Sequence, residues 1–369
     1  MKILFLNFLR LWMIVIYAPL KLLPIQKNKV VFISRQTNGV NLDYRLLQGY
    51  VKKQNPDVRY VNICRRYEKG FGEYAAFVGN ILKSLYHLAT TSVCVIDGYW
   101  PAVSMLNHKK ALTVVQIWHA MGKIKKSGYQ SLNKKSGRNP KVAKAMAMHK
   151  NYDVIIASGK AWNKFYCESF GVSEDVLLNC GLPRIDAMLE ADEANRTKIL
   201  QTYPELEGKT VLLYAPTFRK GWNADWDKLS NSLDYDKFAL IVKNHPNQKL
   251  KISDKCYTCD EFTSDELLSV SDYLITDYSA IAVEGAILDV KTYYYVYDYE
   301  KYIENNGLNI DLFEEMPGCV FKKAEDLIDA LNKPYPQQSL DNYKAKFLPE
   351  NLGTSTQTVG NYILKSIKK

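Results

Sequence analysis

The feature of the sequence that most constrains the fold is a series of short apolar runs, each followed by polar residues. Runs without polar alternation are typical of parallel strands that are buried on both faces of a sheet. Longer stretches with helical spacing separate them, so the sequence predicts an α/β fold of alternating strands and helices. The predicted strands are Lys29–Ser34, Val58–Asn62, Ser92–Asp97, Leu112–Trp118, Asp153–Ser158, Thr210–Ala215, Phe238–Lys243, Asp272–Thr276 and Lys291–Val296.

The alternation of apolar runs and helical stretches is interrupted by a charged stretch at residues 190–208 and resumes after it. A chain of 369 residues is long enough for two cores, at roughly 150 residues per domain. We therefore predict an N-terminal Rossmann-like domain at 27–200 and a C-terminal one at 201–369, after a separate segment at 1–26. The basic last helix, from about Thr358, either completes the second domain or packs back on the first.

The N-terminal segment is the strongest anomaly in composition, because its first 25 residues are almost entirely apolar. The stretch without charge between Arg10 and Lys21 is ten residues long, whereas a spanning helix needs roughly 20. We predict an amphipathic helix that lies in a membrane interface and is ended by Pro19 and Pro24. A core helix of the first domain is the alternative. The face predicted to point to water carries Asn7, Arg10, Tyr17 and Lys21.

Composition narrows the class of partner. Lys and Arg outnumber Asp and Glu by 49 to 39, and a net charge of +10 favours nucleic acid, phosphorylated substrates or acidic lipid. The basic segments lack interleaved aromatic residues, so nucleic acid fits poorly. Seven scattered cysteines indicate reduced thiols in a cytosolic protein. Cys256 and Cys259 form a lone C-x-x-C without the second pair that a zinc site needs.

Polar residues that could take part in catalysis or binding follow the predicted strands. Parallel sheets bind their ligands beyond the carboxyl ends of their strands. In the first half, His119 comes directly after a strand and can accept a proton from a hydroxyl near neutral pH. A loop rich in lysine and glycine follows it and suits phosphate oxygens. The residues of this loop that we select are Lys123, Lys125, Lys126 and Gly128.

The second half has its own strand-end residues. His245 follows Asn244 after one strand. Thr217 and Arg219 follow another strand and suit a phosphate clamp. A third strand ends in Thr276, Asp277 and Ser279, of which the last two are good N-cap types for the next helix, and free N–H groups there favour a pyrophosphate. Glu284, one turn further on, either reaches a ribose hydroxyl or faces solvent.

Several signatures are missing from the sequence. It contains no Walker A motif, no G-x-G-x-x-G, no G-x-S-x-G and no D-x-D pair after a strand. These absences argue against an NTPase, a dehydrogenase, a serine hydrolase and a metal-dependent A-type glycosyltransferase. We expect no cofactor, and no ligand cluster demands a metal.

The ordered motifs resemble the CDP-glycerol glycerophosphotransferase family of teichoic acid synthesis, over about residues 90–345. The sequence departs from the family pattern at Ala120, Leu182, Ala280 and Gly285. These departures affect the loops. They leave open whether the donor carries glycerol or ribitol, and which acceptor is used. The motifs that carry the resemblance are Trp118-His119, Lys125-Lys126-x-Gly128, Gly181-x-Pro-Arg184, Ala215-Pro-Thr-Phe-Arg219, Asn244-His245-Pro246, Thr276-Asp-Tyr-Ser279 and Tyr297-Asp298…Gly307…Pro317-Gly318.

The resemblance implies a GT-B fold, with two Rossmann-like domains around a central cleft and a membrane-associating N-terminal helix. It also implies transfer of a polyol phosphate from a CDP-activated donor to a hydroxyl of an undecaprenyl-linked glycan, with release of CMP. Glycerol phosphate is the first candidate for the transferred group. The implied location is the cytoplasmic face of the cell membrane. In this scheme His119 is the base on the acceptor and His245 contacts the donor pyrophosphate. Arg184 lies at the domain junction. The other implied donor contacts are Thr217, Arg219, Asn244, Thr276, Asp277, Ser279 and Glu284.

Three alternatives remain at this stage. A CDP-ribitol-using ribitolphosphotransferase differs only in the donor. A GT-B glycosyltransferase that uses a nucleotide sugar shares the fold. A non-catalytic polyanion-binding protein at the membrane needs only the positive charge and the N-terminal helix.

Overall fold

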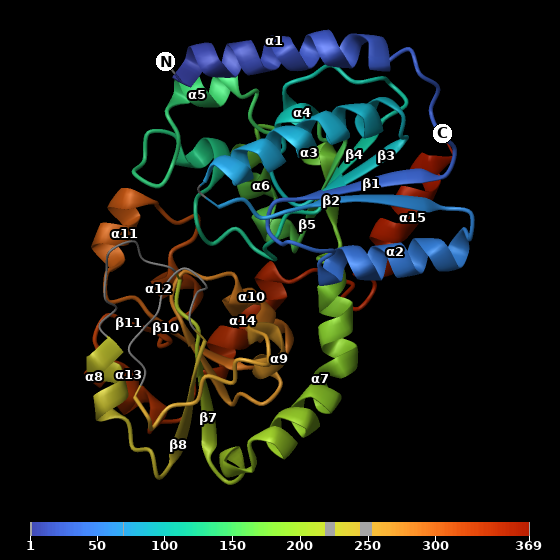
Figure 1. Ribbon diagram of the computed structural model, residues 1–369. Coiled ribbons are helices and arrows are strands. Elements are labelled where there is room, and N and C mark those ends of the chain that lie inside the picture. The colour runs from blue at the N-terminus through green and yellow to red at the C-terminus, as the bar shows by residue number, and fades with distance from the viewer. Residues whose placement is uncertain (1, 69, 218–225, 244–252, 369) are drawn as a thin grey trace. The chain divides into compact units, whose positions relative to one another are not determined.

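The computed structural model describes residues 2–68, 70–217, 226–243 and 253–368 (Figure 1). The chain forms two compact units, one of residues 1–120, 127–186 and 349–369 and the other of residues 121–126 and 187–348. Each is an α/β unit built on a parallel sheet, so the predicted fold class is confirmed.

The first unit contains a six-stranded sheet in the order β2-β1-β3-β4-β5-β6, with every pair parallel. Five of these strands were predicted to within two residues at each end, because each is a continuous apolar run. The sixth, β6, was not predicted, because it is only three residues long and half-buried. The bounds are β1 Lys29–Ser34, β2 Arg59–Cys64, β3 Val93–Ile96, β4 Thr113–Gln116, β5 Val154–Ala157 and β6 Leu177–Asn179.

Helices cover both faces of this sheet. In Figure 1, α3 and α4 lie on one side of it, and α2 and α15 lie on the other. Asn41 caps α2 by accepting a hydrogen bond from the backbone N–H of Tyr44, which satisfies one of the free donors at the start of the helix. The bounds are α1 Lys2–Leu20, α2 Leu42–Gln54, α3 Phe71–Ala89, α4 Pro101–Ser104, α5 Pro140–Ala145, α6 Asn163–Phe170 and α15 Ser355–Ile367.

The last helix, α15, packs on α2 of the first unit. A Cβ atom at Gly360 would lie 2.3 Å from Cδ1 of Tyr50, so the glycine permits the close approach of the two helices. The Tyr50 hydroxyl also donates a hydrogen bond to Oδ1 of Asn361 at 2.9 Å. The C-terminal end of the chain is therefore part of the first unit.

The second unit contains a five-stranded parallel sheet in the order β11-β10-β9-β7-β8. The four longer strands were predicted, and the two-residue β11 was not. The strand bounds are β7 Thr210–Tyr214, β8 Phe238–Val242, β9 Tyr273–Thr276, β10 Lys291–Tyr295 and β11 Val320–Phe321. The helix bounds are α7 Pro183–Thr202, α8 Trp226–Ser232, α9 Ser264–Leu268, α10 Ile281–Ile287, α11 Tyr299–Asn305, α12 Leu312–Glu315, α13 Ala324–Leu331 and α14 Gln337–Phe347.

The division of the chain lies near the start of α7. The sequence places the boundary at residue 200, in the charged stretch, whereas α7 runs through that residue and the two compact units divide after Asp186. Asp186 holds the start of α15, because its carboxylate accepts hydrogen bonds from the N–H groups of Ser355 and Thr356. This contact keeps the first turn of α7 with the first unit.

The N-terminal helix α1 contacts the first unit through two of the residues that were expected to face water, Tyr17 and Arg10. Tyr17 is 2% exposed, and its hydroxyl hydrogen-bonds Nδ1 of His108 at 2.8 Å. Arg10 Nε donates to the carbonyl of Met105 at 3.1 Å. The helix also continues through Pro19 to Leu20. The side predicted to face water is therefore divided: Tyr17 is buried against the first unit, whereas Asn7 and Arg10 are exposed as predicted.

The outward face of α1 is apolar instead. Its exposed large side chains have more than half of their surface accessible to water: Leu4 74%, Phe5 63%, Phe8 67%, Leu11 61% and Val15 65%. By length and composition alone the 19-residue helix is also sufficient to cross a membrane, although one such helix near an N-terminus is weak evidence for a span.

Candidate active site

His119 lies beyond the carboxyl end of β4, in the first unit, with its side chain exposed. The residue before it, Trp118, has a φ of 58°, a left-handed conformation that is unfavourable for a bulky side chain and often marks a functional site. The ring of Trp118 lies 4.1 Å from that of His119, between centroids. The strained backbone therefore turns the imidazole out of the strand end.

The hydrogen bond at Nδ1 determines which tautomer His119 adopts. Nδ1 is 3.1 Å from the carbonyl oxygen of Asp97. A carbonyl only accepts, so Nδ1 carries the proton and the lone pair resides on Nε2. The amide of Gln36 lies further away, 3.5 Å from Nδ1. A neutral imidazole held in this way is suited to accept a proton at Nε2.

Arg184 holds the main chain at His119. Its Nη2 donates to the carbonyl of His119 at 3.3 Å, and its Nη1 forms an ion pair with Asp43 Oδ2 at 3.0 Å. The backbone N–H of Arg184 donates to Oδ1 of the same carboxylate at 2.8 Å. Because Asp43 is buried in the first turn of α2, Arg184 connects a fixed carboxylate to the histidine backbone.

Asp97 stands at the end of β3, and its carboxyl group is buried. Oδ2 accepts hydrogen bonds from the hydroxyl of Ser34 at 2.6 Å and the amide of Asn41 at 3.1 Å. Burial raises the pKa of this carboxyl to about 6, because desolvation disfavours the charged form. The sequence did not single out Asp97, Gln36 or Asp43; the position of Asp97 as the last residue of a predicted strand was the available signal.

The lysine-rich loop is assigned to a different compact unit from His119. Residues Met121–Lys126 belong to the second unit, where Lys126 N–H donates to the carbonyl of Gly307 and Lys125 forms an antiparallel bridge with Leu308. Lys123 is 3% exposed, and burial lowers its pKa to about 7. Near neutral pH, Lys123 is therefore charged only part of the time, unlike an ordinary surface lysine.

Gly128 has a reason to be glycine that is independent of phosphate. Its φ is +57°, and a Cβ there would lie 2.1 Å from the carbonyl oxygen of Ser169. Any other residue would clash with this backbone. The glycine is thus explained by packing against α6.

In the second unit, Asp277 joins the ends of β7 and β9. Its Oδ1 accepts hydrogen bonds from the N–H of Thr217 at 3.0 Å and from the Thr217 hydroxyl at 2.6 Å. The N–H of Tyr278 donates to the same oxygen at 2.5 Å. Thr276 is fully buried, and its hydroxyl donates to the carbonyl of Ala215 at 2.7 Å. These hydrogen bonds fix the shape of the strand ends.

The start of α10 differs from the prediction. Its N-cap is Ala280, without a side-chain cap, so the expectation that Asp277 or Ser279 caps this helix is wrong. Asp277 binds Thr217 instead, and the half-buried Ser279 side chain forms no hydrogen bond with the described residues. Glu284 is buried within α10, so it does not face solvent.

Three of the predicted site residues, Arg219, Asn244 and His245, lie outside the described residues. Within the parts of the chain that are described, no group of three or more His, Cys, Asp or Glu side chains is arranged to hold a metal ion. The seven cysteines, all of which are described, are free thiols.

Proteins of known structure share the fold of this chain. Structures of the wall teichoic acid polymerase TagF match with a TM-score of 0.74 at 21% sequence identity, over 93% of this chain and 90% of theirs. At this identity the match shows the fold, and the protein is a GT-B-like α/β protein.

The sequence comparisons identify the family. Residues 16–365 match the family model described as CDP-Glycerol:Poly(glycerophosphate) glycerophosphotransferase, and the chain belongs to this family. The teichoic acid ribitol-phosphate primase of Bacillus spizizenii is 29% identical over 359 residues, which are 93% of this chain and 92% of that protein. The teichoic acid glycerol-phosphate primase of Bacillus subtilis is 27% identical over 77% of this chain and 76% of its own. The resemblance seen in the motifs is confirmed, and the chain is a CDP-polyol phosphotransferase.

Proposed function

We propose that the protein transfers a polyol phosphate from CDP-glycerol or CDP-ribitol to a hydroxyl of a lipid-linked glycan in teichoic-type polymer synthesis, with His119 as the base. The observation that carries the role of His119 is its hydrogen bond to the carbonyl of Asp97. With the ring proton on Nδ1, the lone pair of Nε2 is the one that can accept the proton of an acceptor hydroxyl.

The reaction forms one bond and breaks one. The acceptor oxygen attacks the phosphorus that carries the polyol, the bond from that phosphorus to the bridging oxygen of the pyrophosphate breaks, and CMP leaves. The acceptor proton passes to Nε2 of His119. Charge at the phosphorus is spread over several oxygens, so positioning and electrostatic stabilisation carry most of the catalysis, and a positioned base adds about 10²- to 10⁴-fold.

We assign the donor to the second unit. Asp277 and Thr217 shape the strand ends through their mutual hydrogen bonds, and Ser279 offers a hydroxyl beside them. Glu284 is proposed as the ribose contact, and Arg219, Asn244 and His245 as pyrophosphate contacts from their place in the sequence. Lys125 and Lys126 supply positive charge in the same unit.

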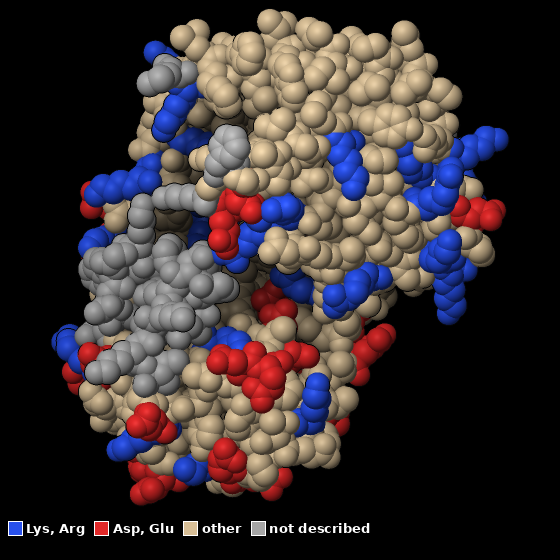
Figure 2. Space-filling model, in the orientation of Figure 1, with Lys and Arg blue, Asp and Glu red and all other residues tan. Residues whose placement is uncertain are grey.

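We also propose that the enzyme acts at the cytoplasmic face of the cell membrane, held there by α1. The support is the apolar outward face of this helix, which continues onto exposed Tyr74, Val78 and Leu82 of α3. Figure 2 shows an almost uncharged surface over α1, with Lys and Arg side chains at its margins. A contiguous apolar surface with basic margins is typical of proteins that bind anionic lipid.

The decisive experiment is a donor screen. The purified protein is incubated with CDP-glycerol, CDP-ribitol or a UDP-sugar and a soluble analogue of the lipid-linked disaccharide, and nucleotide release and product length are measured. CMP release from a CDP-polyol supports the proposal. Release from the UDP-sugar alone, or no turnover of any donor, contradicts it.

Membrane attachment has a separate test by flotation with anionic vesicles. Phe8→Asp places a charge on the outward face of α1 and should abolish flotation, whereas Asn342→Asp adds the same charge at an exposed position of α14 in the second unit and serves as the control. Equal flotation of the two variants contradicts the role of this face.

A further inference from the structure

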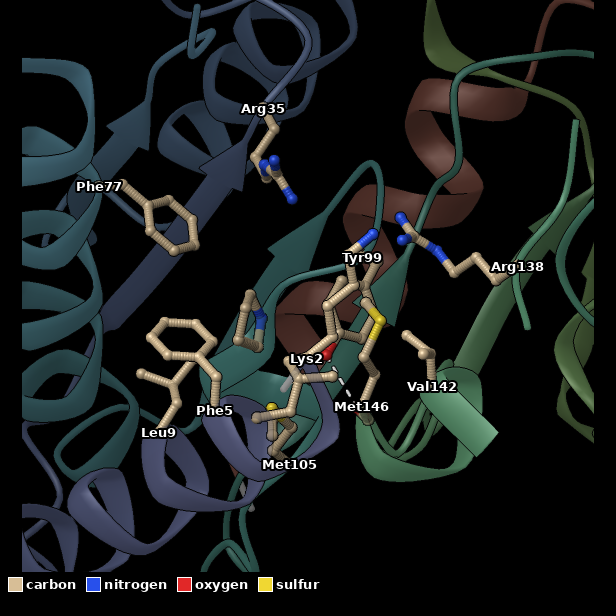
Figure 3. Close-up of a pocket in the computed structure, with 12 residues that line it drawn as sticks. Lys2, Phe5, Leu9, Arg35, Phe77, Tyr99, Met105, Arg138, Val142 and Met146 are labelled. Carbon is tan, nitrogen blue, oxygen red and sulfur yellow. Dashed lines mark hydrogen bonds between the residues drawn. The ribbon is translucent and has the colours of Figure 1, made fainter. Parts of the chain in front are cut away.

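A cavity of about 620 Å³ lies beneath α1 in the first unit. This volume falls within the range of roughly 300–1,000 Å³ that is typical of small-molecule sites. Phe5 and Leu9 of α1, Phe77 of α3, and Val142 and Met146 at α5 supply most of its walls (Figure 3). The cavity is therefore apolar on the side that adjoins the exposed face of α1.

The other end of the cavity is cationic. Arg35 and Arg138 enter from opposite sides and point toward the space beside Tyr99 (Figure 3). Lys2 also lines the cavity, and none of its lining residues is acidic. Neither guanidinium forms an ion pair within the described part of the chain.

The two arginines repel each other across this space. The guanidinium of Arg35 lies over the rings of Phe77 and Tyr67, 5.5 and 5.8 Å from their centroids. Its pKa is below the usual arginine value, first because of burial and also because of the positive charge of Arg138. Two guanidiniums that line one cavity without an acidic lining residue are stabilised by a bound anion with several oxygens.

The cationic end adjoins the surroundings of His119. Arg35 directly precedes Gln36, whose amide lies 3.5 Å from Nδ1 of that histidine. Tyr99, which lines the cavity and donates to the carbonyl of Met146 at 2.8 Å, is two residues from Asp97. All of these residues belong to the first unit.

We infer that this cavity binds the lipid diphosphate of the acceptor, with the first part of its apolar chain against α1 and its diphosphate between Arg35 and Arg138. The inference rests on the proposed function, because it locates the lipid portion of that acceptor. The remaining chain follows the outward apolar face of α1 into the membrane. A diphosphate held at this end directs the attached sugar toward His119.

Direct binding tests the site without catalysis. Farnesyl diphosphate is titrated into the full-length protein by calorimetry, in parallel with farnesyl monophosphate, farnesol and inorganic pyrophosphate. The diphosphate lipid should bind at least about tenfold more tightly than each of the other three, because only it uses both ends of the cavity. Equal affinity for farnesyl monophosphate, for farnesol or for pyrophosphate alone overturns the inference.

Variants locate the binding. Arg35→Gln and Arg138→Gln should each weaken farnesyl diphosphate by about tenfold and leave farnesol unchanged, whereas Val142→Trp should weaken both by filling the apolar end. Lys141→Gln removes a neighbouring exposed cation of α5 that does not line the cavity, and it should change neither. Arginine variants that bind like the unmodified protein overturn the inference.

Steady-state kinetics with two acceptors distinguishes a failure of this inference from a failure of the proposed function. In Arg35→Gln, the KM for an acceptor with a lipid diphosphate should rise about tenfold, whereas kcat/KM for a soluble acceptor with the same terminal sugar should not change. An equal loss with both acceptors overturns the lipid site. No CMP release from the unmodified protein with the soluble acceptor contradicts the proposed function, and the calorimetry still decides the cavity.

Discussion

The strand ends of the two units use their polar residues in opposite ways. At the end of β4, the polar groups around His119 bind its main chain and its Nδ1 atom, and the ring remains exposed. At the ends of β7 and β9, Asp277 and Thr217 bind each other. The first arrangement presents a side chain to a substrate, and the second holds two strands together. Substitutions should therefore separate catalysis from stability.

The largest effect is expected at His119. His119→Ala should lower kcat by about 10²- to 10⁴-fold, because it removes the proposed base. The free energy of unfolding should change by less than about 0.5 kcal/mol, because the ring is exposed. CMP release and urea unfolding measure the two quantities. A variant that releases CMP at nearly the original rate would remove His119 from the base role.

The next effect is a pH dependence of stability caused by Asp97. The pKa of its carboxyl is about 6 in the folded state against 3.8 for the ordinary group, so the folded protein binds the proton more tightly. This group's contribution to stability is complete below pH 3.8 and is lost as the pH rises through 6, by about 3 kcal/mol in total.

Asp97→Asn should abolish this loss. Between pH 4 and 7 its free energy of unfolding should gain about 3 kcal/mol relative to that of the unmodified protein, as measured by urea unfolding at several pH values. Parallel pH profiles for the two proteins would show that the carboxyl does not titrate in this range.

A smaller loss of stability is expected in the second unit. Asp277→Ala removes the oxygen that accepts three hydrogen bonds, and it should lower the free energy of unfolding by about 2 kcal/mol. Thr217→Ser keeps the hydroxyl, so it is the matched control and should cost less than about 1 kcal/mol. Similar melting temperatures for both variants would contradict the joining role of Asp277.

The smallest effect is expected at Arg184. Lysine cannot contact both Asp43 and the carbonyl of His119, so Arg184→Lys should lower kcat by about tenfold through misplacement of the histidine. In a His119→Ala background the same substitution should have almost no further effect on kcat. Additive losses in the double variant would show that Arg184 acts independently of His119.

Much of the fold was predictable because buried parallel strands are continuous apolar runs. The sequence located nine of the strands in this way, and it missed β6 and β11, which are too short and too exposed to carry the pattern. It also selected His119 from its place after a strand. It did not find Arg35 and Arg138, because 103 residues separate them in the chain and neither belongs to a recognisable motif.

The sequence by itself determined the α/β class, the family and the identity of the strand-end residues, because local hydrophobic patterns and short motifs encode them. Only the tertiary structure decided the orientation of α1, the protonated nitrogen of His119 and the pairing of Asp277 with Thr217. These features depend on contacts between residues far apart in the chain. Tyr17 of α1 points inward because His108 of the first unit offers its hydroxyl a hydrogen bond, and no periodicity within the helix carries that information.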